Sequence, residues 1–362
     1  MKKGILLVFL SLILVMALVV ACAPAPAPTP APAPKPVPAP APAPPPKTVQ
    51  WKLQSFQPAV QERYSVSVVE LCNRIEKATE GRVKITPYPS GALVPDGELI
   101  TALGNNVIQG SNLAGAITAG VLPVSVVEYG LPMSYDNAQD TWTLFWDKGL
   151  ENVLEESYNK LKIHYLVHQP PLLPVVQMTS RPIRSLSDMK AMKVRAIGAL
   201  ATWYAKIGAS PVSMPMGEMY MALKLGTVDG GATGLDVHYS FKHQEVCKYA
   251  MTPNPIDMTP LNILVNLDAW NELSAADKAT VTKVARDWSK WSVEVWDPPL
   301  AKKTRDGLME AGVQWIEMPA DDVVKMKAAA IEVWDEFAAK DPASAKAVAI
   351  LKDYYRAKGK IK

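Results

Sequence analysis

A run of alternating prolines divides this chain before any folded part can begin. Residues 23–47 read APAPAPTPAPAPKPVPAPAPAPPPK. Proline fixes φ and lacks a backbone N–H, so this segment can join neither a helix nor a sheet. We expect a semi-rigid, polyproline-like spacer that reaches roughly 75 Å when fully extended. The folded part must therefore lie within residues 48–362, a length that suits two compact lobes.

The segment before the spacer has the form of a bacterial export signal. Residues 1–21 read MKKGILLVFLSLILVMALVVA, with two lysines followed by an unbroken apolar stretch. The junction VVAC, residues 19–22, resembles a lipobox, whose cysteine receives a diacylglyceryl group before cleavage. We therefore expect a signal peptide over 1–21, lipidation at Cys22, and a linker over 22–47 that holds the folded part outside the membrane. The alternative is a plain membrane anchor in which Cys22 is incidental.

Charge and cysteine content exclude some classes of partner. The chain carries 38 Lys and Arg against 35 Asp and Glu. It has no basic arm, so we do not expect nucleic acid as a partner. No apolar run after the export signal is long enough to span a membrane. Cys72 and Cys247 follow Cys22, and whether they pair in an oxidising compartment stays open.

Strand-like and helix-like stretches alternate through the rest of the chain, which predicts mainly parallel sheets with covering helices. A stretch from Ser274 to Trp296 begins with a capping arrangement, Ser274 followed by Asp277, and is long enough to cross between two lobes. The expected strands are 49–56, 82–89, 162–168, 175–180, 193–197 and 312–318. The first expected helix carries Val68, Leu71, Cys72 and Ile75 on one face and ends just before Gly81. The other expected helices are 98–107, 141–161, 199–208, 217–226, 274–296 and two at the C-terminus.

The sequence offers little that resembles catalytic machinery. GxSxG, HExxH, Walker and CxxC motifs do not occur in it. His164 and His168 would face the same way in a strand, but two packed or exposed histidines explain them better than a metal site. Arg195 ends the strand-like run KVR. From the residues alone, it is either a salt-bridged surface group or a fixed cation for an anionic ligand.

The stretch from residue 181 to residue 230 resembles the central signature of the solute-binding subunit of TRAP transporters, the DctP-type proteins. The matching elements are SLSDMKAMKVR, KIGASPVSM and EMYMALKLGTVDG, in this order and spacing. Upstream, EKATEGRVKITPYPSGAL is similar to the family's first helix and second strand, and NLDAWNELSAADKATV is similar to the start of its long helix. VWDEFAAKDPASAKAVAILKDYYR and YGLPMSYDNAQDTWTLFW look closest to the branch that binds 2-oxo and 2-hydroxy monocarboxylates.

This resemblance implies a two-lobed, periplasmic-binding-protein-like α/β fold of the class II type. Each lobe would hold a sheet flanked by helices, with a long helix between the lobes. We place lobe I at 48–172 plus 261–300 and lobe II at 173–260 plus 301–362. The implied function is capture of a small organic acid outside the membrane and its delivery to a TRAP-type membrane permease, without catalysis. The branch also implies a homodimer through residues 321–362.

The resemblance also implies the binding residues. The family's arginine at the position of Arg195 holds the substrate carboxylate, and a guanidinium suits this task because its planar fork matches two carboxylate oxygens. The other implied contacts are Gln177, Met216, Ala232, Thr233, Phe56 and Gln57. The candidate packing residues are Glu218, Asp229, Trp142, Trp146, Trp288 and Trp291, of which Trp142 is the one most suited to approach a ligand.

The chain departs from the family at two places. Many relatives have a second arginine about twenty residues before the first, where this chain has PVVQMTS and Gln177. Some members of the monocarboxylate branch hold a Na⁺ or Ca²⁺ ion through that glutamine and a glutamate after the VDG motif. Here Ala232 and Thr233 follow the motif, and Asp236 comes only later. Because a hard cation wants several oxygen ligands, we expect no required metal, with Gln177 and Asp236 as the candidate ligands.

Two other functions stay open. An ABC-type solute receptor would have a similar cleft, although the signature from residue 195 to residue 230 argues against it. An extracytoplasmic enzyme acting on small acids would need a general base or nucleophile near Arg195. The nearby segments offer only Glu218 and Asp236 for that role.

Overall fold

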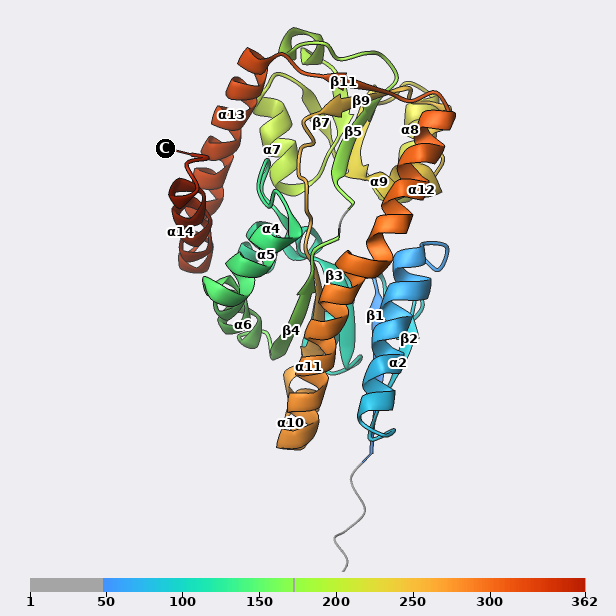
Figure 1. Cartoon of the computed structure of the whole chain (residues 1–362), viewed down its shortest axis with the longest axis vertical. Coiled ribbons are helices and arrows are strands. Elements are labelled where there is room, and N and C mark those ends of the chain that lie inside the picture. The colour runs from blue at the N-terminus through green and yellow to red at the C-terminus, as the bar shows by residue number, and fades with distance from the viewer. Residues whose placement is uncertain (1–47, 172, 362) are drawn as a thin grey trace, which may run out of the picture. The chain divides into compact units, whose positions relative to one another are not determined.

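Two β-sheets, each covered by helices, organise the folded part of the chain (Figure 1). The computed structural model describes residues 48–171 and 173–361. Residues 46–362 form one compact unit. The predicted signal peptide, the linker and Cys22 lie outside the described residues. This architecture confirms the predicted α/β fold with a flanked sheet in each lobe.

The first sheet has the strand order β2-β1-β3-β10-β4. β1 pairs in parallel with β2 and β3, whereas β10 runs antiparallel between β3 and β4. Alternation builds β1: Val49, Trp51 and Leu53 are buried, while Gln50 and Lys52 are exposed. The strands are β1 (Val49–Ser55), β2 (Val83–Tyr88), β3 (Gly110–Ala114), β4 (Ile163–Gln169) and β10 (Leu261–Asn266).

Helices of the first half cover this sheet. In α2, Leu71, Cys72 and Ile75 form the predicted apolar face and are buried, because their spacing places them on one side of the helix. The helices of this half are α2 (Val69–Ala78), α3 (Leu99–Gly104), α4 (Val124–Tyr129), α5 (Ala138–Trp142) and α6 (Leu150–Asn159).

The second sheet has the order β11-β9-β5-β8-β6-β7. β5 is antiparallel to β8 and β9, and β6 is parallel to β7 and β8. The prediction of mainly parallel sheets is confirmed with one exception in each sheet: β10 and β5 run against their neighbours, while the other described strands of each sheet run in one direction. The strands are β5 (Val175–Thr179), β6 (Lys193–Arg195), β7 (Ser210–Val212), β8 (Gly230–Gly234), β9 (Tyr249–Thr252) and β11 (Gln314–Glu317). The helices beside it are α7 (Gly198–Lys206), α8 (Met219–Lys224) and α9 (Leu235–Ser240).

One long helical run passes both sheets, as Figure 1 shows in orange. α10 (Leu267–Asn271) precedes α11 (Ala275–Trp291), and a π-helical turn, Ser292–Trp296, joins α11 to α12 (Asp297–Glu310). The Ser274 side chain accepts from the Asp277 N–H, as predicted from the sequence. α11 packs on α2 and β4, whereas α12 packs on α9. The run therefore connects the two halves.

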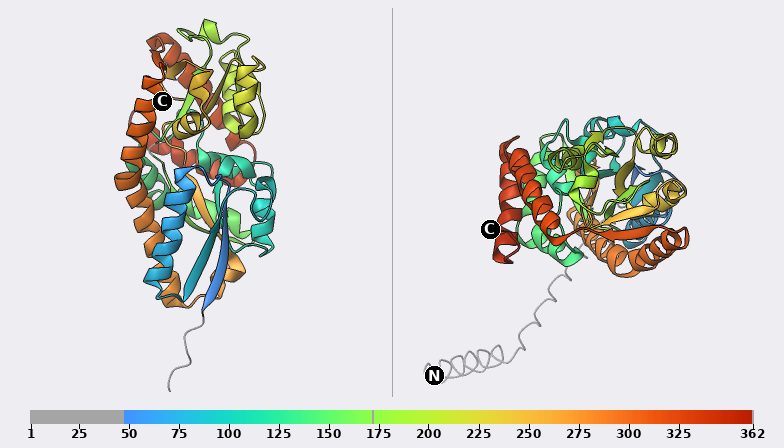
Figure 2. Two further views of the ribbon diagram at one scale, coloured as in Figure 1. Left: turned by 90° about the vertical axis from the view of Figure 1, so that its right-hand side faces the viewer. Right: turned by 90° about the horizontal axis from the view of Figure 1, so that it is seen from above.

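The last two helices, α13 (Ala320–Ala338) and α14 (Pro342–Ala357), pack against each other. α13 contacts α7, while α14 contacts α4 and α6. Figure 1 and the right-hand view of Figure 2 show them along one side of the unit. Because they contact elements from both halves, the lobe limits named above stay a prediction.

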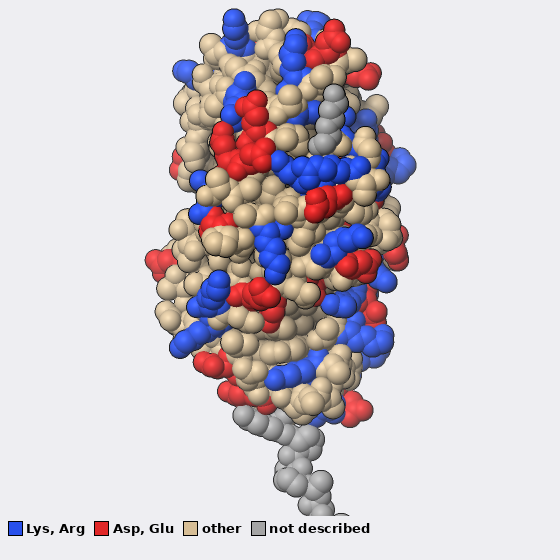
Figure 3. All heavy atoms as spheres, turned by 90° about the vertical axis from the view of Figure 1, so that its left-hand side faces the viewer, with Lys and Arg blue, Asp and Glu red and all other residues tan. Residues whose placement is uncertain are grey.

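The face that carries α13 and α14 shows Lys and Arg interspersed with Asp and Glu (Figure 3). Lys206 there pairs with Glu332 and Glu336, at 2.9 Å in each case. This face offers no extended basic surface of the kind that binds nucleic acid.

Two further expectations need correction or completion. The helix predicted over 141–161 is interrupted, because α5 passes into a π-helical turn and Gly149, at φ +84°, starts α6. Cys72 and Cys247 are both free and buried, and they belong to different apolar clusters. Within residues 48–171 and 173–361, no helix is both long enough and apolar enough to cross a membrane.

Candidate ligand-binding site

A cavity of about 490 Å³ lies where segments of both halves meet. Its volume falls within the range of roughly 300–1,000 Å³ that is common for small-molecule sites. β1 leads into its wall through Phe56 and Gln57, and β6 leads into it through Arg195. Most of the lining is apolar, including Ile117, Val126, Leu173, Val175, Ile197, Leu200 and Ile256. The polar groups are few, so their positions decide what the cavity can hold.

Arg195 is the last residue of β6 and is 5% exposed. Its Nε and Nη2 both donate to the Met214 carbonyl at 3.2 Å, and Nη1 lies 3.5 Å from the Ala232 carbonyl. No Asp or Glu of the described chain pairs with it. Burial lowers the pKa of Arg195, yet a guanidinium keeps its charge at any ordinary pH. The strand end therefore presents a fixed cation without a counter-ion.

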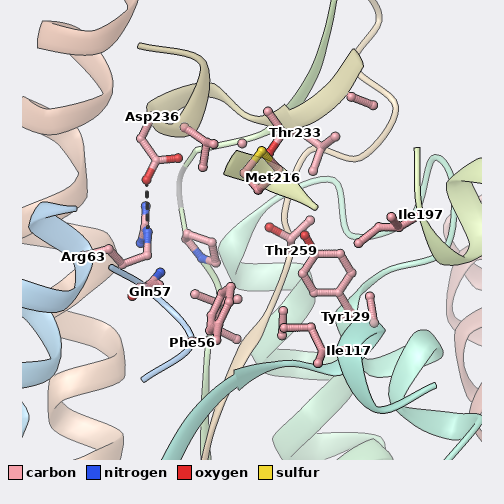
Figure 4. Close-up of a pocket in the computed structure, with 18 of the residues that line it drawn as sticks. Phe56, Gln57, Arg63, Ile117, Tyr129, Ile197, Met216, Thr233, Asp236 and Thr259 are labelled. Atoms are coloured by element: carbon pink, nitrogen blue, oxygen red, sulfur yellow. Dashed lines mark ion pairs between the residues drawn. The ribbon is translucent and has the colours of Figure 1, made fainter. Parts of the chain in front are cut away.

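Tyr129 and Thr259 lie together on the cavity wall (Figure 4). The two side chains are hydrogen-bonded. Burial raises the pKa of Tyr129, an effect that the charge of Arg195 opposes. The phenol is therefore protonated at neutral pH and adds a neutral hydrogen-bonding group at the Arg195 end.

Two buried histidines lie behind the second sheet. His238 Nε2 is 3.0 Å from the Val176 carbonyl, which places its proton on Nε2, and its Nδ1 is 3.1 Å from Nδ1 of His243. Burial lowers the pKa of His238 to about 3 and that of His243 to about 4, and the charge of Arg195 acts in the same direction. Both rings are therefore neutral at pH 7, so neither adds a second positive charge to that of Arg195.

A second arginine, Arg63, lines the opposite side of the cavity. It is 3% exposed, and its Nη1 donates to Asp297 Oδ1 at 3.2 Å. Its Nε lies 3.5 Å from Asp236 Oδ2 at the start of α9, the ion pair drawn in Figure 4. Unlike Arg195, this guanidinium is shared by two carboxylates.

Near Arg63 lie Gln57, Ser90 and Asp96, which also line the cavity. The Ser90 N–H donates to the Gln57 carbonyl at 2.9 Å, and Ser90 Oγ donates to Asp96 Oδ2 at 2.7 Å. Gln57 is 4% exposed. Its Oε1, like Asp96 Oδ1, is buried without a hydrogen-bond partner in the described chain. We call Gln57, Arg63, Ser90, Asp96 and Asp236 the distal group.

The structure brings together most of the residues proposed from the sequence. Arg195, Met216, Ala232, Thr233, Phe56 and Gln57 all line the cavity. Gln177 does not line it: this residue is fully buried in β5, opposite Ala232 of β8.

The metal proposal finds little support in the arrangement. Among the residues described, there is no group of three or more His, Cys, Asp or Glu side chains that could hold an ion. Gln177 is outside the cavity lining and Asp236 is engaged by Arg63. His164 lies 2.8 Å from Glu155 and stacks on Trp270, whereas His168 stacks on Phe145.

The aromatic candidates act in packing. Trp142 stacks on Trp146 and does not line the cavity. Trp288 is fully buried and donates from Nε1 to the Ser67 carbonyl at 2.8 Å. Trp203 is buried in the largest apolar cluster.

Sequence reasoning missed Arg63, Asp96, Tyr129 and Thr259. Asp96 and Tyr129 stand in loops or at helix ends, where the sequence carries no periodic signal. Arg63 carried no such signal either, because α-helical spacing back from Leu71 and Val68 reaches Tyr64 and not Arg63. Its buried partner, Asp297, lies 234 residues away in sequence.

Comparisons with known proteins agree with this architecture. Residues 59–341 match the family model described as bacterial extracellular solute-binding protein, family 7, named DctP. The monocarboxylate 2-oxoacid-binding periplasmic protein of Nostoc sp. is 24% identical over 230 residues, which is 62% of each chain.

Solved structures share the fold. A TRAP periplasmic solute-binding protein of Chromohalobacter salexigens, with bound (S)-(+)-2-amino-1-propanol, is 25% identical at a TM-score of 0.75, covering 86% of this chain and 97% of its own. A TRAP solute-binding protein of Bordetella bronchiseptica, a dimer with calcium and picolinate in one site, is 21% identical at a TM-score of 0.75, covering 86% and 95%.

Proposed function

Because the chain belongs to family 7 of the bacterial extracellular solute-binding proteins, the DctP-type receptors of TRAP transporters, we propose that it captures a small organic acid and delivers it to a membrane permease. One observation carries this proposal: Arg195 presents a buried guanidinium in the cavity with no carboxylate partner in the described chain. A buried cation without a counter-ion is costly. An anionic ligand would remove that cost.

The proposed clamp follows from the contacts of Arg195. The Met214 carbonyl accepts from Nε and Nη2, and the Ala232 carbonyl lies near Nη1. These contacts fix the plane of the guanidinium, while N–H groups on Nη1 and Nη2 remain for a carboxylate. The protonated hydroxyl groups of Tyr129 and Thr259 lie in the same cavity and would orient the acid further. In a closed, dry cavity such contacts are stronger than at a surface.

We propose that closure of the two lobes over the acid is the signal that the permease reads. The lobes are residues 48–172 plus 261–300 and residues 173–260 plus 301–362. Cys22 would carry the lipid, and residues 22–47 would tether the receptor to the outer side of the membrane. Homodimerisation through residues 321–362 belongs to the same proposal.

For the ligand, we propose a monocarboxylate, with a 2-oxo or 2-hydroxy acid as the first class to test. The name of the Nostoc relative supports this class. We propose no required cofactor, because Gln177 lies outside the cavity lining and Asp236 is held by Arg63.

The two alternatives have less support. An ABC-type receptor would not carry the family 7 pattern over residues 59–341. For an enzyme on small acids, the candidate bases are poorly placed, because Glu218 does not line the cavity and Asp236 pairs with Arg63. Recovery of an acid chemically unchanged after long incubation would argue against turnover.

Thermal melting against a panel of acids tests the proposed function. The panel contains pyruvate, lactate, branched 2-oxo acids, dicarboxylates, sugar acids and aromatic acids, each with and without calcium. A ligand that binds only the folded state raises stability by about 2.7 kcal/mol at a hundredfold excess over its Kd. A shift with one class of acid supports the proposal, and a well-folded protein that responds to none contradicts it.

A further inference from the structure

The wall formed by the distal group carries two acceptors without donors and one donor, Arg63 Nη2, without an acceptor in the described chain. Gln57 is 4% exposed, and its Oε1 is buried without a partner in the described chain. Asp96 Oδ1 is likewise buried and unpartnered, while its Oδ2 accepts from Ser90. Buried polar atoms in native proteins are nearly always hydrogen-bonded. The unpartnered acceptors outnumber the unpartnered donor, and Arg63 is already shared by Asp236 and Asp297, so this wall favours a ligand end that supplies donors.

Local structure holds these acceptors in place. The Ser90 N–H donates to the Gln57 carbonyl at 2.9 Å, and the Gln57 N–H donates to Ser55 Oγ at 3.1 Å at the end of β1. Ser90 Oγ then fixes Asp96. The Gln57 backbone at the end of β1 and the Asp96 carboxylate are thus held in place before a ligand arrives.

The charges along the cavity are arranged as a dipole. Arg195 stands at one end as a cation without a counter-ion. The distal group holds one cation, Arg63, and two carboxylates, Asp96 and Asp236, so its formal charge is negative. Figure 4 shows Arg63, Gln57 and Asp236 on the side opposite Tyr129 and Thr259. Arg195 belongs to the Tyr129 end, since its charge acts to lower the pKa of Tyr129.

Between the two ends the lining is mostly apolar. Phe56 and Met216 lie there in Figure 4, with Thr233 beside Met216 as a polar neighbour, and Ile117 lies next to Tyr129. A polyhydroxylated ligand would leave its hydroxyl groups against these side chains without partners. A chain of methylene groups fits better.

Together these observations define a ligand with two polar ends, and this step rests on the proposed function. We propose that the receptor binds a carboxylic acid with an apolar middle and a donor-bearing far end, preferentially an ammonium group: an ω-amino acid that is neutral overall. Its carboxylate meets Arg195. Its ammonium group donates to Gln57 Oε1 and to the Asp96 carboxylate, with Asp236 nearby. A simple monoanion would leave these acceptors unpaired, and a dicarboxylate would add like charge beside them.

Matched ligand series test the proposal by isothermal titration calorimetry on the purified full chain in mild detergent. Each series has one chain length, from four to eight carbons, and four far ends: amino, hydroxyl, methyl and carboxyl. 6-Aminohexanoate, 6-hydroxyhexanoate, hexanoate and hexanedioate form one such set. At the best length, the amino acid should bind at least about tenfold tighter than the methyl-ended and dicarboxylic acids, because only it supplies the donors.

Two variants separate the far-end contact from the rest of the site. Asp96→Asn and Gln57→Leu should each reduce the amino-to-methyl affinity ratio by about tenfold, while binding of the methyl-ended acid changes less than about threefold. Asp147→Asn, an exposed carboxylate outside the cavity lining, is the matched control and should leave the ratio unchanged. Melting curves show whether each variant is folded. If one variant does not fold, the other still tests the proposal.

The outcomes distinguish this inference from the proposed function. Acids that bind through Arg195 with the methyl-ended or dicarboxylic member tightest at every length would overturn the inference alone. An amino preference that survives in both variants would also overturn it. If no acid of the series binds but one acid of the melting panel does, the inference alone is overturned; if neither set binds, the inference and the proposed function are overturned together.

Discussion

Arg63 donates from Nη1 to Asp297 Oδ1 at 3.2 Å, joining the turn before α2 to the start of α12 across 234 residues of sequence. Both side chains are almost completely buried, at 3% and 0% exposure. Trp296 adds a cation–π contact, with the Arg63 Cζ 5.3 Å from its ring centroid. Arg63 is the first residue of one π-helical turn, Arg63–Val68, and Asp297 directly follows another, Ser292–Trp296. Such turns are wider than an α-helical turn, and here they occur where the two helical segments meet.

Removing one partner of this ion pair should destabilise the fold. Arg63→Ala leaves the buried Asp297 without this cation, and we expect the free energy of unfolding to fall by roughly 3–5 kcal/mol, measured by urea denaturation. Arg181→Ala is the control, since Arg181 is about half exposed and lies 4.0 Å from Asp229. That variant should lose less than about 1 kcal/mol. Equal losses in the two variants would contradict the role given to Arg63.

Glu128 predicts a specific pH dependence of stability. It is fully buried in α4 and accepts from Tyr158, Tyr165 and Asn262 at 2.7–2.9 Å, yet burial raises its pKa to about 7. The folded state therefore binds a proton that the unfolded state releases near pH 4.5. Its contribution to stability is full below that pH and is lost as pH rises to about 7.

Glu128→Gln should remove this dependence. Relative to the wild type, the variant should gain on the order of 2–3 kcal/mol of stability between pH 4.5 and pH 8. His238 and His243 have lowered pKa values and act in the opposite direction, so the informative quantity is the difference between the two proteins in urea denaturation at each pH. A difference that does not change with pH would show that Glu128 is ionised in the folded state.

Cys72 and Cys247 should be unreactive in the folded protein. Both thiols are buried, and burial raises the pKa of each to about 12, so almost no thiolate forms at neutral pH. A colorimetric thiol titration should detect neither cysteine before denaturant is added and both afterwards. Cys22 adds a third thiol only if it carries no lipid. Absence of both thiols after denaturation would indicate a disulfide.

Gly230 should resist substitution because the second sheet approaches it closely. A Cβ at this position would lie 2.6 Å from the Met178 carbonyl oxygen and 2.8 Å from Gln177 Nε2. Gly230→Ala should therefore cost roughly 1–3 kcal/mol of stability through strain in β5 and β8. Gly120→Ala, which meets nothing within 4 Å, should be close to neutral in the same unfolding experiment.

Periodic patterns in the sequence predicted most of the elements. The apolar face of α2, the alternation in β1 and the Ser274 cap all follow from local chemistry and occur as expected. Strand direction could not be predicted in this way. β10 enters the first sheet antiparallel after the chain has built most of the second sheet, and no local pattern records such a return.

The site could be predicted only in part, because a local sequence pattern does not show which distant residues meet in the fold. Arg195 was found through a family signature that spans the second sheet, and the structure places it in the cavity. Gln177 lies next to Ala232 in register, yet its side chain is buried away from the cavity lining. Arg63 and Asp96 come from separate turns, and only the tertiary fold brings them together.

The affinity of Arg195 variants for the best-bound acid tests the central claim most directly. Calorimetric titration of the full chain should give a Kd about a hundredfold higher for Arg195→Ala, because a charge-assisted contact and its geometry are lost. Arg195→Lys should fall between that variant and the wild type, since it keeps the charge without the fork. If Arg195→Ala remains folded and binds the same acid within about threefold of the wild type, Arg195 does not hold the carboxylate and the account is wrong.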